Sequence, residues 1–192
     1  MSRAIPRLTG IVEQMAAKSR LVYRGLVLYY KELVRAEVEL GRINSSDRVL
    51  CIGGGPCPIS AVLMHEFTGA LVCVIDNDNQ SVMQAREFVQ SLGYEHSIHI
   101  EYSDGREIAP QDYDVIHLAA QVSPLEQVLQ HVREHSREET RILVRLPRER
   151  LEHLYEIGDR AAFNQYHAKT DHRWRNVDCT ALFAPLGEYP GL

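Results

Sequence analysis

The spacing of hydrophobic positions along the chain changes near residue 44. Before this point, apolar residues recur at helical spacing over 8–15 and again over 22–40, and Gly41 is a typical helix stop. After it, short apolar runs alternate with helical patterns. The change predicts a helical segment over 1–44, acting as a lid or a dimer contact, followed by an α/β domain over 45–192.

Five apolar runs beyond residue 44 have the length of buried strands, at 49–52, 71–75, 98–102, 113–119 and 141–146. Helical patterns separate or follow them, ending near 67 and spanning 80–92, 124–135 and 148–157. Two weaker runs remain, at 161–167 and 177–184, and the second suits an antiparallel edge strand. Strands that alternate with helices of about 10–15 residues predict a parallel sheet. The expected fold is α/β, with seven mostly parallel strands, helices on both faces and 49–52 at the centre.

A glycine-rich turn follows the first predicted strand directly. Gly53, Gly54 and Gly55 stand between this strand and the next helix, where glycine lets the backbone approach a ligand closely and the helix N-terminus offers free N–H groups. Asp76 ends the second strand, and a carboxylate there can accept both hydroxyls of a ribose. Together these residues predict a nucleoside site, and the alternative is a tight turn without a ligand.

The details of the turn favour a nucleoside without phosphates. A third glycine in dinucleotide register is missing, and so is the Gly-Lys-Ser/Thr of a P-loop. Pro56 and Pro58 also remove N–H donors where a pyrophosphate would need them. S-adenosylmethionine is the usual nucleoside of this kind. Asp104 and Gly105 follow the third strand, where a carboxylate can accept the adenine amine; a plain turn is the alternative.

Composition narrows the class of protein further. Of the 192 residues, 45% are hydrophobic and 24% are charged, which is typical of a globular enzyme-sized domain, and the net charge of −5 argues against a broad cationic surface for nucleic acid. The uncharged run 49–64 is broken by glycine and proline, so no membrane span is expected, and 1–10 lacks the apolar core of a secretory signal. The four scattered cysteines fit a reducing, cytoplasmic setting. His131 and His135 share a helix face but lack a third ligand, so we expect no metal.

Several segments resemble one protein family. Residues 49–60, VLCIGGGPCPIS, resemble the first motif of class I S-adenosylmethionine-dependent methyltransferases, and the Gly-Gly-Gly-Pro-x-Pro form is similar to nicotianamine synthase and its archaeal and bacterial relatives. The order and spacing of the segments are more specific than any one of them. The resemblance covers about 29–154, and 176–183 more weakly. Three further segments match the family, at 30–43 (YKELVRAEVELGRI), 113–122 (YDVIHLAAQV) and 141–146.

The resemblance implies a fold and a reaction. The family has a Rossmann-like class I methyltransferase domain with a helical N-terminal domain over its site. Its members transfer the 3-amino-3-carboxypropyl group of S-adenosylmethionine to an amine and release methylthioadenosine. By position, Tyr30 and Glu37 are the expected catalytic residues, with Glu32 at another acidic position of the same helix. The expected cofactor-binding residues are Gly53, Gly54, Gly55, Pro56, Asp76, Asn77, Asp104, Gly105, Ala119 and Gln121.

One departure from the family affects the expected chemistry. The N-terminal helical domain of the family is longer than the 44 residues present here, and one of its catalytic acidic residues lies in that portion. Either Glu13 or another group takes its place, or the chemistry differs. Tyr23, Tyr30 and Glu37 are seven residues apart and therefore lie near one helical stripe that could cover the cofactor, although they could equally form a core edge and a solvated carboxylate.

Three functions stay open on the sequence. The first is aminocarboxypropyl transfer to a small-molecule amine or amino acid, or internal cyclisation of that group. The second is methylation of a small molecule, although the fourth strand ends His117-Leu118-Ala119-Ala120 without an Asn-Pro-Pro-Tyr-type motif. The third is a non-catalytic module that binds the cofactor. Arg145, Arg148 and Arg150 could meet a carboxylate substrate or stand at a solvated helix start, and the N-terminal helix could support a homodimer.

Overall fold

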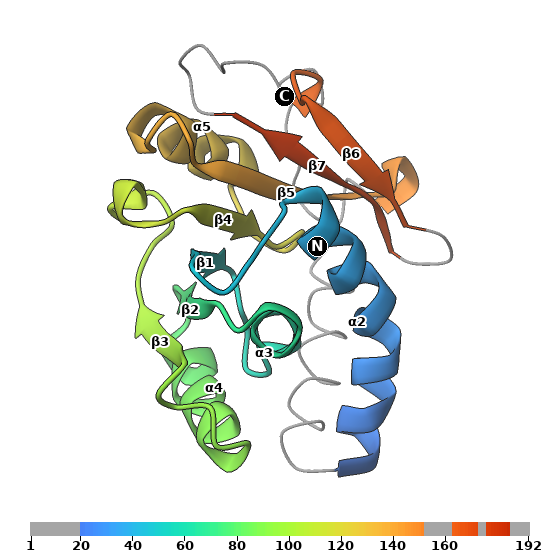
Figure 1. Cartoon of the computed structure of the whole chain (residues 1–192), viewed down its shortest axis with the longest axis vertical. Helices are drawn as coiled ribbons and strands as arrows, with labels where there is room; N and C mark the ends of the chain where they lie inside the picture. The colour runs from blue at the N-terminus through green and yellow to red at the C-terminus, as the bar shows by residue number, and fades with distance from the viewer. Residues whose placement is uncertain (1–19, 152–162, 173–175, 185–192) are drawn as a thin grey trace.

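The computed structural model describes residues 20–151, 163–172 and 176–184, which form one seven-stranded sheet with helices on both faces (Figure 1). The strand order is β3-β2-β1-β4-β5-β7-β6. The strands are β1 (Arg48–Ile52), β2 (Leu71–Asp76), β3 (Ile98–Tyr102), β4 (Val115–Leu118), β5 (Arg141–Pro147), β6 (Ala168–Asp171) and β7 (Val177–Phe183). The helices are α2 (Arg20–Leu40), α3 (Ile59–Thr68), α4 (Asn79–Ser91) and α5 (Leu125–His135), with 3-10 turns η1 (Pro110–Asp112) and η2 (Glu149–Leu151).

Alternation along the strands divides the core into two layers. In β1, Val49 and Cys51 pack in the layer that contains α2, α3 and α4, whereas Leu50 and Ile52 pack in the layer that contains α5. Both faces of the central strands are covered, and for this reason their sequences are continuously apolar rather than alternating. The predicted seven-stranded, mostly parallel fold is therefore confirmed, with β1 central between β2 and β4.

The end of the sheet differs from the expectation in two respects. The last strand along the chain, β7, is antiparallel to β5 as predicted, but it is not the edge of the sheet, because β6 pairs with its other side. The sequence of β6, Ala-Lys-Thr-Asp, is too polar to read as a strand, and its side chains are half-buried or exposed. The weaker run 161–167 and the helix expected over 148–157 lie partly outside the described residues.

Helix α2 is joined to the sheet and to its neighbouring helix. It packs beside α3, and Leu33 and Val34 are buried between it and the sheet. At its C-terminal end, Arg141 of β5 donates from Nη1 to the carbonyl of Gly41 at 2.8 Å. The part of the predicted 1–44 segment that is described is thus held by the sheet, while 8–15 and Glu13 lie outside the described residues. No helix in the described part of the chain is both long and apolar enough to cross a membrane.

Candidate active site

The glycine turn after β1 has a backbone that only glycine adopts easily. Gly53 has φ 80° and Gly55 has φ 63°, in the left-handed region where a Cβ atom is strained. The N–H groups of Gly53 and Gly54 both donate to the carbonyl of Ile75 in β2, at 2.9 and 3.3 Å. A Cβ atom on Gly54 would stand 2.1 Å from Cγ1 of Val74. The turn therefore lies flat against β2 because it has no side chains.

Asp76 at the end of β2 fixes this turn from the other side. Its Oδ2 accepts the N–H of Gly55 at 2.8 Å, and its Oδ1 accepts the N–H of Asp78 at 3.0 Å. Burial raises the pKa of the Asp76 carboxyl, against the N–H donors that favour the charged form. Each carboxylate oxygen can accept more than one hydrogen bond, so lone pairs are left over for a ligand.

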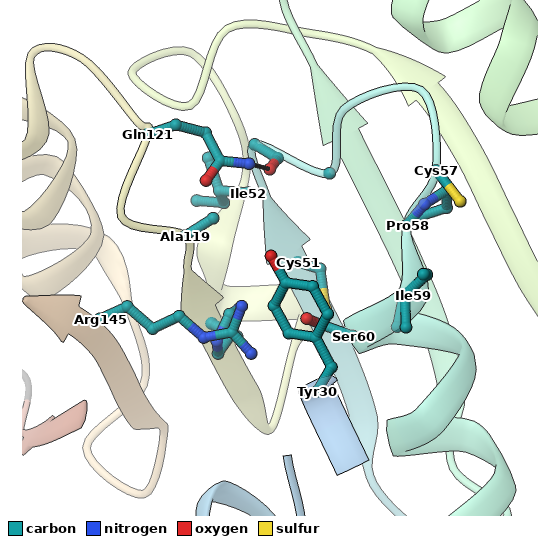
Figure 2. A pocket seen from close by; sticks show the side chains of 14 residues that line it. Tyr30, Cys51, Ile52, Cys57, Pro58, Ile59, Ser60, Ala119, Gln121 and Arg145 are labelled. Atoms are coloured by element: carbon teal, nitrogen blue, oxygen red, sulfur yellow. Dashed lines mark hydrogen bonds between the residues drawn. The ribbon is translucent and has the colours of Figure 1, made fainter. Parts of the chain in front are cut away.

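A pocket opens where the carboxyl ends of β1 and β4 meet, as Figure 2 shows. It contains about 420 Å³ of space between protein atoms, part of it open to solvent. Side chains of Tyr30 from α2 and Arg145 from β5 point into it, and Gln121 donates from Nε2 to the carbonyl of Gly53 at 3.0 Å. The lining residues are Tyr30, Cys51, Ile52, Gly53, Gly54, Cys57, Pro58, Ile59, Ser60, Ala61, His117, Ala119, Gln121 and Arg145.

The pocket brings together five of the twelve residues expected from the sequence. Tyr30, Gly53, Gly54, Ala119 and Gln121 line it, from three segments of the chain: α2, the turn after β1 and the residues after β4. The other expected residues, all near the ends of β1, β2 and β3 or in α2, are not among its lining residues: Glu37, Gly55, Pro56, Asp76, Asn77, Asp104 and Gly105.

Asp104 and Gly105 after β3 have partners of their own. The Asp104 carboxylate accepts from Nε and Nη2 of Arg106 at 3.0 and 2.6 Å, and these hydrogen bonds lower its pKa to about 2. A Cβ atom on Gly105 would stand 2.9 Å from Cγ2 of Ile52 and 3.0 Å from Cγ1 of Val128. Close packing against β1 and α5 thus accounts for this glycine.

Glu37 occupies the centre of a buried polar group beneath the pocket. Nε and Nη2 of Arg145 donate to its two carboxylate oxygens, each at 2.7 Å, and the carboxylate is fully buried. Burial raises the pKa of Glu37, but the charges of Arg145 and His117 and their hydrogen bonds outweigh it, so the net pKa is lowered. The side chain is a carboxylate locked in a bidentate ion pair, out of contact with the pocket surface.

Three more side chains complete what we call the Glu37 cluster, defined as Glu37, His117, Arg145, His172 and Thr180. The Thr180 hydroxyl donates to Oε1 of Glu37 at 2.7 Å, and Nε2 of His172 lies 2.8 Å from the same hydroxyl oxygen. Nε2 of His117 lies 3.4 Å from Oε1 of Glu37. Burial, and then the Arg145 charge, lower the pKa of His117 despite Glu37, so this imidazole is neutral near pH 7.

Arg145 of β5 and His117 of β4 were not identified from the sequence as members of a buried cluster. Arg145 was open between a carboxylate contact and a solvated helix start, yet its side chain is buried inside β5. His117 likewise stands in β4 among apolar residues and is 1% exposed. A charged or polar residue within a continuous apolar strand is the signal that points to both, because such a residue must find a buried partner.

A known protein family matches the part of the chain that forms this site. The family model described as "Nicotianamine synthase protein" matches residues 26–175, which include the whole glycine turn and all the residues that line the pocket. The chain belongs to the nicotianamine synthase family.

The curated relatives share about half of their length with this chain. An L-histidine 2-aminobutanoyltransferase of Pseudomonas aeruginosa is 29% identical over 137 residues, covering 71% of this chain and 50% of the relative. A protein of the same name from Yersinia pestis is 28% identical over 101 residues, covering 52% and 37%. The chain thus spans about half the length of the curated relatives it matches.

Solved structures confirm the fold. A glutamate-to-glutamine variant of MtNAS superposes with a TM-score of 0.78 at 22% identity, covering 93% of this chain and 70% of that one. MtNAS in complex with MTA and tNA gives a TM-score of 0.73 at 23% identity, over 93% and 70%. An RNA methyltransferase from Salinibacter ruber, in complex with S-adenosyl-L-homocysteine, gives 0.63 at 17% identity, over 84% and 95%. The expected class I methyltransferase-like fold is therefore correct.

Proposed function

We propose that the chain uses S-adenosylmethionine as a co-substrate and transfers its 3-amino-3-carboxypropyl group to an amine of a small acceptor. The observation that carries the proposal is the pocket at the carboxyl ends of β1 and β4, with the glycine turn on one wall and Tyr30 of α2 on another. Family membership supports the same chemistry, because relatives are named for 2-aminobutanoyl transfer to L-histidine and for nicotianamine synthesis. An amino acid is accordingly the class of acceptor that we propose.

The glycine turn is the part of the site that suits a nucleoside. In parallel α/β sheets, ligands bind at the carboxyl ends of the strands, and here Gly53 directly follows β1. Asp76 presents a carboxylate beside the turn, with lone pairs for ribose hydroxyls, and Asp104 stands at the end of the neighbouring β3 for the adenine amine. Ala119 and Gln121, after β4, would face the sulfonium end.

The proposed reaction is a displacement at carbon. The acceptor nitrogen forms a bond to the γ-carbon of the transferred group while the bond from that carbon to the sulfonium sulfur breaks. The electron pair of this bond stays on sulfur, methylthioadenosine leaves, and the acceptor ammonium loses a proton. Because the sulfonium carbon is already activated, the protein mainly orients the two reactants and excludes water.

Tyr30 and Glu37 contribute differently in this proposal. The Tyr30 ring lines the pocket, and its face lies 5.6 Å from Cζ of Arg145, so Tyr30 is the group placed to touch a reacting amine. The Glu37 carboxylate is buried beneath the surface and is bonded to Arg145 and Thr180. Its burial favours a positioning role, and its assignment as a catalytic residue stays a prediction.

Analysis of the by-product tests the reaction class. The protein would be incubated with S-adenosylmethionine and a panel of amino acids that includes L-histidine, and the products separated by chromatography. Methylthioadenosine is the expected by-product. S-adenosylhomocysteine alone, formed with an active acceptor, would replace the proposal with methyl transfer, which this sheet architecture also supports elsewhere. Neither product, with intact cofactor binding, would leave a non-catalytic binding module.

A pair of tyrosine variants tests the assignment of Tyr30. Tyr30→Phe removes the hydroxyl but keeps the ring, so turnover should fall about tenfold or more while the Kd for S-adenosylmethionine changes little. Tyr29→Phe is the matched control, because Tyr29 is the adjacent residue of α2 and does not line the pocket. Equal rates for Tyr30→Phe and the parent protein would remove Tyr30 from the mechanism.

The remaining expectations extend the proposal to the setting of the enzyme. The four cysteines are free and buried, which supports a reducing cytoplasmic location. We propose that 1–44 acts as a lid over the 45–192 domain, since α2 supplies Tyr30 to the pocket. A homodimer through the N-terminal helix stays a prediction, and so does the expectation that nucleic acid is not a partner.

A further inference from the structure

The hydrogen bonds of Arg145 leave part of its guanidinium unused. A guanidinium carries five N–H bonds. Two of those on Arg145, from Nε and Nη2, go to Glu37. The other three have no partner among the residues that the structure describes, although Arg145 is only 5% exposed. Buried polar groups in proteins are nearly always hydrogen-bonded. Because Arg145 lines the pocket, these three donors can serve an acceptor that binds there.

Arg141, four residues earlier in the same strand, shows what an arginine with a purely structural role looks like here. Its Nη1 donates to the carbonyls of Gly41 and Arg42, and its Nη2 donates to Asp47. Arg141 does not line the pocket, whereas Arg145 does. Two arginines of one strand thus differ in whether their outer nitrogens are bonded to the protein or face an open space.

The Glu37 cluster keeps the free side of Arg145 aimed at that space. Glu37 accepts hydrogen bonds from one edge of the planar guanidinium. The hydroxyl of Thr180 in β7 donates to Glu37 and holds it in place. The Tyr30 ring covers the guanidinium at 5.6 Å. Held in this way, the opposite edge of the fork is preorganised for a planar acceptor with two oxygens, which describes a carboxylate.

The place of Arg145 in the sheet separates it from the proposed nucleoside end. In the strand order, β2 and β3 with Asp76 and Asp104 lie on one side of β1, and β5 lies on the other side beyond β4. A nucleoside over the ends of β2 and β3 would therefore extend its amino-acid end toward Arg145. Both proposed substrates, S-adenosylmethionine and an amino-acid acceptor, carry an α-carboxylate.

We infer that Arg145, held by Glu37, is the binding site for the α-carboxylate of an amino-acid substrate, supplied either by S-adenosylmethionine or by the acceptor. The inference rests on the proposed function and deepens it. It makes Arg145 a specificity-determining residue, which selects ligands with a free carboxylate over the corresponding amines.

Two pairs of ligands test the inference on the unmodified protein by titration calorimetry. The first pair is S-adenosylmethionine and its decarboxylated form. The second is L-histidine and histamine, titrated with saturating methylthioadenosine present. We expect the ligand without the carboxylate to bind about tenfold more weakly, or worse, in one pair. The pair that responds identifies the source of the carboxylate. No difference in either pair would overturn the inference, while binding of S-adenosylmethionine itself would leave the proposed function standing.

An arginine variant then assigns the preference to Arg145. Arg145→Lys keeps a positive charge for Glu37 but loses the fork, so the tenfold preference should shrink to about threefold or less. Arg137→Lys is the control, because Arg137 forms an exposed ion pair with Asp114 away from the pocket, and it should keep the full preference. A folded Arg145→Lys protein with an unchanged preference would contradict the inference. If this variant does not fold, the ligand pairs alone decide it.

Discussion

The glycine turn forms one wall of the pocket and the Glu37 cluster supports another, which His117 and Arg145 line, and the two are built on opposite principles. The turn is made from consecutive residues after β1, and it works through backbone N–H groups and missing side chains. The cluster is made from α2, β4, β5 and β7 and the residue after β6, so that Glu37 and Thr180 are 143 residues apart. One wall is local backbone geometry, and the other is side-chain charge assembled by the fold.

This difference has energetic consequences. A turn made of glycines is sensitive to added volume, because a Cβ atom on Gly53 or Gly54 meets a packed neighbour. A buried ion pair is sensitive to the loss of one member, because the partner is left charged without compensation in a low dielectric. Substitutions at the two walls should therefore differ both in size and in how they can be rescued.

The largest effect is expected at Glu37. Glu37→Ala leaves Arg145 charged and unpaired in the core, so the free energy of unfolding should fall by about 3–5 kcal/mol, measured by urea denaturation. Glu32→Ala is the control in the same helix, since Glu32 forms an exposed pair with Arg35, and it should cost less than about 0.5 kcal/mol. The double variant Glu37→Leu/Arg145→Met should recover most of the loss. A Glu37→Ala protein as stable as the parent would show that the buried ion pair is not sensitive to the loss of one member.

The next effect is expected at Gly54. Gly54→Ala places a Cβ atom against Val74, 2.1 Å from Cγ1, and should cost about 1–3 kcal/mol because the buried valine has to move. Gly25→Ala is the matched control in α2, where a Cβ atom meets nothing within 4 Å. That change should stabilise the protein by about 0.5–1 kcal/mol through helix propensity. Thermal unfolding of both variants gives the comparison, and similar shifts in Tm would refute the role of close packing at the turn.

A binding effect is expected at Asp76, whose carboxylate accepts the N–H of Gly55 in the glycine turn. Asp76→Ala removes the carboxylate proposed to hold the ribose, and the Kd for S-adenosylmethionine should rise about tenfold, because hydrogen bonds to a charged group are worth ~1.5–3 kcal/mol. Asp112→Ala, at an exposed carboxylate of η1, should leave the Kd unchanged. Calorimetry on a folded Asp76→Ala protein with normal affinity would withdraw the assignment.

The smallest effect is a pH dependence of stability that comes from the cluster. The pKa of buried His117 is lowered from its ordinary value of 6.5. Just below pH 6.5, this imidazole therefore binds a proton more readily in the unfolded chain than in the folded chain. Stability should therefore fall as the pH is lowered from 6.5 toward 5.5, because of this group. The lowered pKa of Glu37 acts in the same direction below its ordinary value of 4.5.

Histidine variants isolate that contribution. His117→Asn should flatten the fall in the free energy of unfolding between pH 6.5 and 5.5, whereas His99→Asn, at an exposed position of β3, should preserve it. Urea denaturation at several pH values measures both slopes. A His117→Asn protein with the slope of the parent would show that this imidazole is not the group that titrates.

Much of the parallel sheet could be predicted because its determinants are local. Strands buried on both faces are continuous apolar runs, and 98–102 coincides with β3 to the residue. The pattern failed at β6, because Ala-Lys-Thr-Asp is polar and its pairing depends on β7 rather than on its own side chains. Edge position was misassigned to β7 for the same reason, since a sequence pattern does not show which strands will lie beside it.

What the sequence alone determined is the glycine turn, with Asp76 beside it, because consecutive glycines and one strand-end carboxylate encode their geometry within a single βαβ unit. It also marked Tyr30 and Glu37 by family resemblance. Tertiary structure alone decided that Glu37 lies beneath the pocket rather than in it. It also decided that Arg145 both binds Glu37 and lines the pocket. The physical reason is that a buried charge is defined by its partners. Those partners come from α2, β5 and β7, and only the folded sheet brings these elements within hydrogen-bonding distance.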